Sequence, residues 1–152
     1  MLYLDSSLLV KAYLKEADSE SVLAKLAPSE RTFTSFLSFA EILAVFARKF
    51  REGLLSTGDW HAARAEFRRD WELKLSILEV NSQTLASVEI LVARHPLRGA
   101  DSVHLSTALC LRDNMRFSRG MASEDAVPEF CTADKRLAEF ANLEGLKVFL
   151  PA

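Results

Sequence analysis

The fold is indicated first by the stretch MLYLDSSLLVKAYL, residues 1–14. Residues 2–4 form a short apolar run, as in a buried strand, and the run ends at the acidic residue Asp5. Residues 6–14 then carry apolar side chains at helical spacing. A strand that leads directly into a helix is the building unit of α/β proteins, so this stretch favours that class.

The same alternation of strands and helices continues along the chain. Further strands are predicted over residues 32–35, 75–80, 130–132 and 147–150, and helices over 18–26, 37–51, 56–73, 82–94, 101–114 and 134–141. Residues 116–129 are polar and irregular, and we expect a loop there. Such alternation predicts a central, mostly parallel sheet covered by helices on both faces. We therefore expect one α/β domain over residues 1–152, with three α/β/α layers.

Four acidic residues stand where an ordinary core would not place them: Asp5, Glu41, Asp101 and Asp134. Asp5 and Asp134 each follow a predicted strand, at the edge of a parallel sheet where ligands bind. Glu41 interrupts a helix that is apolar almost all round. Carboxylates are rarely buried unless they are paired or bind a metal ion. The set predicts a site for a hard divalent cation, Mg²⁺ or Mn²⁺, and hence metal-dependent phosphodiester chemistry.

Each acid also has a purely structural interpretation. Asp5 and Asp134 have the side chain and the position of helix N-caps. Asp101 could be a first-turn acid that complements the helix dipole. Ser38 and Glu41 have the spacing of a capping box, in which the glutamate bonds back to the start of the helix. The two interpretations compete evenly for any one acid, whereas the occurrence of all four favours the metal site.

Charge and composition exclude some classes of protein. The formal net charge is −2 and the sequence pI is about 5.9, which disfavours a DNA-reading module and is neutral for a nuclease. Cys110 and Cys131 match no metal or redox spacing, and we interpret them as small buried apolar residues. No apolar run reaches the roughly 18 residues that a membrane span needs, and no basic leader precedes the first strand. We expect a cytoplasmic protein with no membrane contact.

The segments around the four acids resemble a known family. LDSSLLVK (residues 4–11), AEI (40–42), ADSVHL (100–105) and TADKRL (132–137) are similar to the PIN domain. More narrowly, they are similar to the VapC-type toxin ribonucleases of bacterial and archaeal toxin–antitoxin modules. The resemblance spans nearly the whole chain and implies a three-layer α/β/α PIN-like fold. It further implies an endoribonuclease that requires Mg²⁺ or Mn²⁺, a cognate antitoxin that blocks the site, and a homodimer.

The resemblance also implies a role for each acid. Asp5 and Asp101 would be the main metal ligands, and Asp134 would bind the ion directly or through water. Glu41 would orient a water molecule or hold a second ion.

Five neighbouring residues are further candidates. Ser6 and Thr132 are hydroxyls beside the acids, and we expect them to support the ligands by hydrogen bonds, with ordinary capping or turn bonding as an equal alternative. Arg98 and Arg136 are candidate contacts to the RNA backbone, although charged residues more often form a solvated face. His104 lies one helical turn after an acid and could touch the site, although an ordinary hydrogen-bonded helix histidine is the commoner case.

Three other functions stay open at the level of sequence. A housekeeping RNA-processing nuclease without an antitoxin would carry the same acids. A catalytically silent PIN-like module that binds RNA or protein would not need all four. A phosphatase on a similar fold usually carries Asp-x-Asp after the first strand, where this chain has Asp5-Ser6-Ser7.

Overall fold

The computed structural model describes residues 1–118 and 127–151. Within these ranges the chain forms a five-stranded sheet in which all neighbouring strands are parallel. The order is β3-β2-β1-β4-β5, and the strands are β1 (Leu2–Leu4), β2 (Thr32–Ser35), β3 (Leu75–Leu78), β4 (Glu129–Cys131) and β5 (Val148–Phe149). The parallel sheet expected from the alternating pattern is confirmed.

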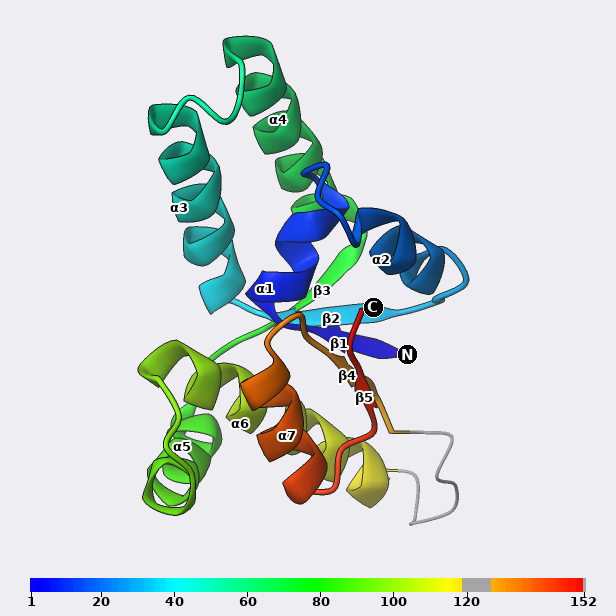
Figure 1. The fold of residues 1–152 in the computed structure, drawn as a ribbon. Coiled ribbons are helices and arrows are strands. Elements are labelled where there is room, and N and C mark those ends of the chain that lie inside the picture. The colour runs from blue at the N-terminus through cyan, green and yellow to red at the C-terminus, as the bar shows by residue number, and fades with distance from the viewer. Residues whose placement is uncertain (119–126, 152) are drawn as a thin grey trace.

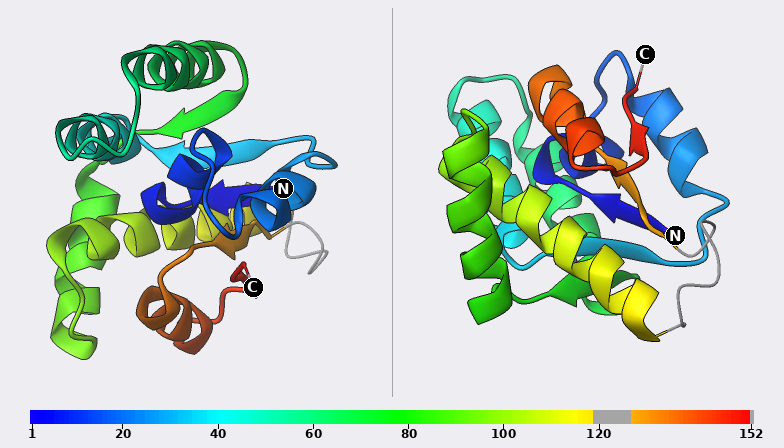
Figure 2. Two further views of the ribbon diagram at one scale, coloured as in Figure 1. Left: turned by 45° about the horizontal axis from the view of Figure 1, so that its top comes forward. Right: turned by 90° about the horizontal axis from the view of Figure 1, so that it is seen from below.

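Helices cover both faces of this sheet, so the three-layer α/β/α arrangement is also confirmed (Figures 1 and 2). One face carries α1 (Ser6–Leu9), α2 (Ser19–Leu26), α3 (Leu37–Arg51) and α4 (Thr57–Leu73). The opposite face carries α5 (Ser82–Arg94), α6 (Gly99–Ser118) and α7 (Lys135–Leu143). A short 3₁₀ turn, η1 (Val10–Ala12), continues α1.

The central strand β1 contributes to two separate cores. Leu2 and Leu4 pack in the core under α1–α4, together with Phe67 of α4. Tyr3 points the other way and packs in the core under α5–α7, together with Leu105 of α6. Successive strand residues face opposite sides of a sheet, so a strand covered on both faces must be apolar throughout. This explains the unbroken apolar run at residues 2–4.

The order in which successive strands are added to the sheet reverses beside β1. From β1 the chain adds β2 and β3 on one side, and then crosses to add β4 and β5 on the other. Leu2 therefore lies between Thr32 of β2 and Glu129 of β4. In sheets of this kind, ligands bind outside the carboxyl ends of the strands at the switch point. Asp5 follows β1 and Asp134 follows β4, so both stand at that edge.

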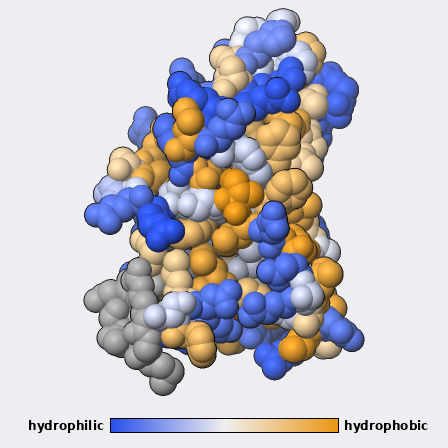
Figure 3. Space-filling model, turned by 180° about the vertical axis from the view of Figure 1, so that it is seen from behind, coloured by the Kyte–Doolittle hydropathy of each residue, from blue (hydrophilic) through white to orange (hydrophobic). Residues whose placement is uncertain are grey.

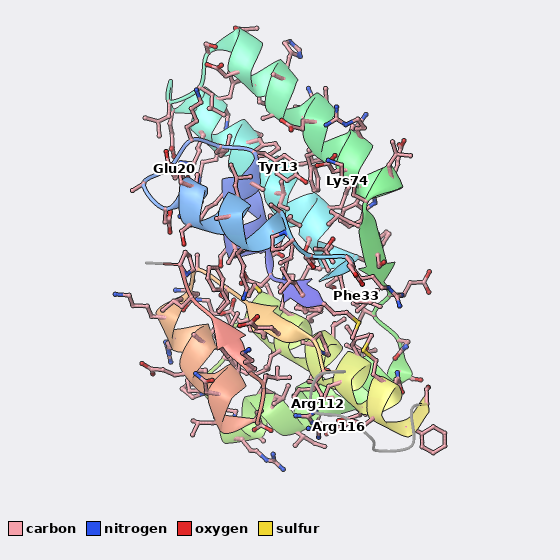
Figure 4. The ribbon with its side chains drawn as sticks, turned by 90° about the vertical axis from the view of Figure 1, so that its right-hand side faces the viewer. Tyr13, Glu20, Phe33, Lys74, Arg112 and Arg116 are labelled. Carbon is pink, nitrogen blue, oxygen red and sulfur yellow. The ribbon has the colours of Figure 1, made fainter. Side chains whose placement is uncertain are left out.

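Some element boundaries differ from the sequence prediction. The helix expected over residues 6–14 is divided into α1 and η1. Helix α6 extends to Ser118 and β4 begins at Glu129, so the loop expected over residues 116–129 is wrong at 116–118 and at 129, while 119–126 lie outside the described residues. Arg116 (Figure 4) and Phe117 point to solvent, and the Phe117 side chain is 91% exposed. Exposed residues give no apolar periodicity, which is why the sequence did not indicate helix there.

Helices α3 and α4 form a hairpin joined by a turn at Gly53, whose φ of 73° favours glycine. The aromatic residues along α4 face inward: Phe67 is fully buried, and Trp60 stacks on Phe50 of α3 with ring centroids 4.5 Å apart. The aromatic residues of α4 therefore belong to the core beneath α1–α4. Across residues 1–118 and 127–151, no helix has the length and apolar character needed to cross a bilayer.

Candidate active site

Asp5 is buried at the junction of β1 and α1. Its side chain is the N-cap of α1, because the backbone N–H of Leu8 donates to Asp5 Oδ1 over 3.1 Å. Only 3% of the residue is exposed. The capping interpretation is thus correct for Asp5, and it does not account for the burial, since N-caps are ordinarily solvated.

Ser7 is the site residue that the sequence argument missed. Its Oγ lies 2.8 and 3.0 Å from the two carboxylate oxygens of Asp5. It also accepts the backbone N–H of Ala133 and lies 3.3 Å from Thr132 Oγ1, so it ties the end of β1 to the loop after β4. The available signal was local, because Asp and Ser side chains two residues apart commonly share hydrogen bonds.

Asp134 and Thr132 organise that second loop. Asp134 Oδ1 accepts the backbone N–H groups of Arg136 and Leu137 at 2.8 and 3.0 Å, and so caps α7. Thr132 Oγ1 accepts the backbone N–H of Asp134 at 3.0 Å. Turn bonding is therefore one role of Thr132. Its hydroxyl also acts to lower the pKa of Asp5.

Asp101 and Asp134 line one small pocket. Its volume is about 30 Å³ and it is lined by Pro96, Leu97, Arg98, Asp101, Asp134, Arg136, Leu137 and Phe140. Burial raises the pKa of Asp101, and the negative charge of Asp134 raises it further. Arg98 opposes this rise through its positive charge. Both candidate arginines are therefore beside the acids, as expected.

Glu41 is paired with a histidine and does not form the expected capping box. Its Oε2 lies 2.7 Å from His104 Nε2. The capping box is wrong, because the start of α3 has no side-chain cap and the Ser38 hydroxyl bonds to Thr34 at 2.7 Å. Glu41 also has a protein partner, so its burial alone does not require a metal ion. Sequence alone could not place His104 there, because the two residues are 63 positions apart.

The pKa of Glu41 reflects this pairing. Burial raises its pKa, but the hydrogen bond from His104 and the Ser6 hydroxyl outweigh burial and lower it below its ordinary value. Glu41 is therefore ionised at neutral pH. The Ser6 hydroxyl thus acts on Glu41, and its supporting role in the site stays a prediction.

His104 lies close to three of the four acids, Asp5, Glu41 and Asp101. It lies near enough to influence the pKa of Asp5, Glu41 and Asp101, and the pKa of Asp101 is also raised by the charge of Asp134. Its second ring nitrogen, Nδ1, lies 3.1 Å from the buried Tyr3 hydroxyl. Burial raises the pKa of Asp5 despite the opposing effects of His104 and Ser7. The structure thus brings all four predicted acids into one electrostatic neighbourhood.

The acids fit a hard cation by the kind of donor and by charge. All their ligand atoms are carboxylate oxygens, which Mg²⁺ and Mn²⁺ prefer. The raised pKa values of Asp5 and Asp101 indicate negative charge that a cation would stabilise. Their side chains are nevertheless held by protein groups, and nowhere in the described part of the chain are three His, Cys, Asp or Glu residues already grouped to hold an ion.

Two wider clefts lie on the other face of the sheet, beside α4. Their volumes are about 690 and 420 Å³, and Tyr13 and Glu66 line both. Tyr13 and Lys74, labelled in Figure 4, line the larger one. Neither cleft is lined by any of the four acids. Size therefore does not identify the chemical centre, and the small pocket is the better candidate because it contains two of the four acids, Asp101 and Asp134.

Known proteins resemble this chain in sequence and in fold. Ribonuclease VapC45 of Mycobacterium tuberculosis strain CDC 1551 / Oshkosh and ribonuclease VapC49 of strain H37Rv are each 29% identical to it over 116 residues. The matched region is 74% of this chain and 78% of each relative.

Three solved structures share the fold. VapBC2 of Rickettsia felis bound to a promoter DNA fragment has a TM-score of 0.63 and 14% identity, with 100% of both chains covered. A toxin–antitoxin complex of Klebsiella pneumoniae has a TM-score of 0.65 and 18% identity, covering 100% of this chain and 98% of that one. FitAcB of Neisseria gonorrhoeae has a TM-score of 0.62 and 18% identity, covering 99% and 98%. Sequence identity this low supports likeness of fold alone.

A family model for the PIN domain matches residues 2–143. The matched range includes β1 to α7 and all four acids. The chain therefore belongs to the PIN domain family.

Proposed function

We propose that this protein is an endoribonuclease that uses a divalent metal ion, Mg²⁺ or Mn²⁺, and that it is the toxin of a toxin–antitoxin module. The observation that carries the proposal is the gathering of Asp5, Glu41 and Asp101 around His104 at the switch-point edge of the sheet, with Asp134 beside Asp101. The names of the two mycobacterial relatives support RNA as the substrate. The acids alone would suit other phosphodiesters as well.

In this proposal Asp5, Asp101 and Asp134 hold the metal ion. When bound, a divalent ion polarises the phosphoryl oxygen and activates water for attack. Glu41 orients the attacking water, because its lowered pKa keeps the carboxylate ionised and able to accept a hydrogen bond. Ser7 and Thr132 hold Asp5 in place by the hydrogen bonds described above.

Arg98 and Arg136 are proposed to bind the RNA backbone beside the cut. Both line the pocket that contains Asp101 and Asp134. The Arg136 guanidinium donates to the carbonyl of Pro96 at 3.0 Å and lies 5.8 Å from the ring centroid of Phe140. These contacts orient Arg136 while leaving it exposed, so its remaining N–H groups are free to meet phosphate.

The partners in this proposal are an antitoxin and a second copy of the chain. The toxin–antitoxin complexes among the structural neighbours support an antitoxin. Large apolar side chains are exposed on the protein, among them Phe36, Leu85 and Ile90. We expect the product of a small open reading frame beside the gene to co-purify with this chain and to stop cleavage. Without it, light scattering should give twice the 17.0 kDa of a single chain.

The nuclease itself is tested with purified protein free of antitoxin. Single-stranded and structured RNA are incubated with Mg²⁺, Mn²⁺ or EDTA, and we expect cleavage only with metal. Asp5→Asn should cut at least about 100-fold more slowly, because losing a ligand costs more than losing one of its supporting residues. Asp113→Asn, an exposed acid on α6 paired with Arg112, is the matched control and should cut normally. Normal cutting by a folded Asp5→Asn variant would refute the assigned centre.

A further inference from the structure

One buried histidine connects three of the segments that carry the acids. His104 is 1% exposed and lies on α6, one turn after Asp101. Its Nε2 is 2.7 Å from Glu41 of α3, and its Nδ1 is 3.1 Å from the hydroxyl of Tyr3. Tyr3 lies in β1, two residues before Asp5. A single ring therefore contacts α3 and β1 from α6.

The chemistry of the two partners determines where the ring proton lies. An ionised carboxylate only accepts hydrogen bonds, so Nε2 must carry a proton and donate it to Glu41. A phenol, with an ordinary pKa of about 10, keeps its proton at neutral pH and can donate to Nδ1. The neutral ring with its proton on Nε2 satisfies both contacts. This assignment follows from the hydrogen-bond network.

The ring is also held firmly. Tyr3 is fully buried and stacks on Phe130 of β4, with ring centroids 5.5 Å apart and planes 9° apart. A rotation of His104 would break two hydrogen bonds in a region that water does not reach. Buried polar networks whose members are all satisfied specify one geometry, because every alternative leaves a polar group unpaired. Glu41 is the member of this network that remains partly exposed, with 26% of its side chain accessible.

We propose that His104 is a positioning residue that fixes the Glu41 carboxylate at the catalytic centre through Nε2, with Tyr3 fixing the ring through Nδ1. The proposal rests on the proposed nuclease function. It assigns His104 no contact with RNA and no proton transfer. Its effect is to hold Glu41 where a water molecule can be oriented.

Two substitutions separate positioning from simple space filling. In His104→Gln the side-chain amide reaches about as far as Nε2, so it can still donate to Glu41. In His104→Asn the amide reaches only about as far as Nδ1 and cannot. We expect His104→Asn to lower kcat by about 10- to 100-fold with little change in KM, the usual effect of losing an orienting contact. We expect His104→Gln to recover most of that loss.

A second readout does not depend on cleavage. Nitrogen-15 NMR of the imidazole should show the proton on Nε2 and an unprotonated Nδ1 that accepts a hydrogen bond. Tyr3→Phe keeps the ring and its stacking but removes the hydroxyl. It should shift the Nδ1 resonance and lower kcat less than His104→Asn does. A proton found on Nδ1 alone would leave Glu41 without a donor and overturn the proposal.

The chain offers a matched control in a second His–Glu pair. His95 Nε2 lies 2.7 Å from Glu144 Oε1, at the end of α7 opposite Asp134, and both side chains are largely buried. His95→Asn should leave kcat unchanged. The proposal would be overturned if His104→Asn and His104→Gln both kept the activity of the parent. It would also be overturned if both variants lost activity equally and lost thermal stability to the same extent. If the parent protein cuts no RNA, the nuclease function fails, whereas the NMR measurement still decides whether His104 donates to Glu41.

Discussion

At the scale of single residues, the acids divide into two electrostatic types. Asp5 and Asp101 are destabilised as anions, because burial raises the pKa of each, and Asp134 adds repulsion at Asp101. Glu41 is stabilised as an anion by His104 and Ser6, so its pKa is lowered. Acids held at unfavourable pKa values are typical of functional sites. The two types match the two roles proposed for them, binding a cation and orienting water.

The raised pKa of Asp101 gives a prediction for stability. Because the pKa of Asp101 is raised in the folded state, the folded protein binds protons more tightly than the unfolded chain at this group. The contribution of Asp101 to stability is therefore lost as the pH rises above 3.8, the ordinary pKa of Asp. In EDTA at pH 7, Asp101→Asn should therefore have a higher free energy of unfolding than the parent. The difference should shrink as pH falls toward 3.8.

Urea unfolding between pH 4 and 7 measures this directly. Added Mg²⁺ should stabilise the parent more than the variant, because only the parent has the charge that the ion neutralises. Asp113→Asn is again the matched control, since this exposed acid lies at the other end of α6. A variant less stable than the parent at pH 7 in EDTA would contradict the account of Asp101.

At the scale of elements, Asp134 has both a structural and a chemical role. It caps α7 through the N–H groups of Arg136 and Leu137, and it lines the pocket with Asp101. Asn is about as good an N-cap as Asp, whereas Ala cannot cap at all. Substitution at this one position can therefore separate the two roles.

We predict different stabilities and equal activities for two variants of this cap. Asp134→Ala should lower the free energy of unfolding by about 0.5–2 kcal/mol, the usual cost of losing an N-cap. Asp134→Asn should stay close to the parent in stability. Both should lose RNA cleavage, because neither carries the charge. Cleavage retained by Asp134→Asn would limit Asp134 to a structural role.

The parts of the site that the sequence predicted are those determined locally. Asp5 and Asp134 were predictable because a strand end, an N-cap and a following helix lie within a few residues of each other. The contact between His104 and Glu41 was not, because it depends on how α3 and α6 approach across the sheet. The end of α6 was missed for a different reason, since its last residues face solvent and carry no apolar period. The sequence thus indicates where functional residues lie in each element, and tertiary packing decides which of them meet.

At the scale of the whole molecule, the proposed function requires a weakly acidic protein to bind RNA, which is a polyanion. The net charge is −2, so RNA binding depends on local positive charge rather than on overall attraction. Figure 3 shows hydrophilic and hydrophobic surface interspersed on the rear face of the molecule. Arg98 and Arg136 are therefore expected to contribute a large share of the electrostatic binding at the site.

Arg136→Ala should weaken RNA binding equally for all sequences. Each lost phosphate contact should reduce the slope of log affinity against log salt by about 0.7 for single-stranded RNA. Binding is measured in the Asp5→Asn background so that the RNA stays intact. Arg116→Ala, which removes an exposed arginine near the far end of α6, is the control and should leave the slope unchanged. An unchanged slope in Arg136→Ala would exclude Arg136 as a phosphate contact.

The position of β1 between β2 and β4 has a consequence for biosynthesis. Ser7 and Thr132 meet in the folded protein although 125 positions separate them. A ribosome that has translated only the first hundred codons has made β1 and β2 but neither β4 nor Asp134. The nascent chain therefore carries an incomplete centre until residues 129–134 have been translated, and a product terminated before them cannot assemble one. For a protein proposed to cut RNA, this order of assembly protects the ribosome and the message that are producing it.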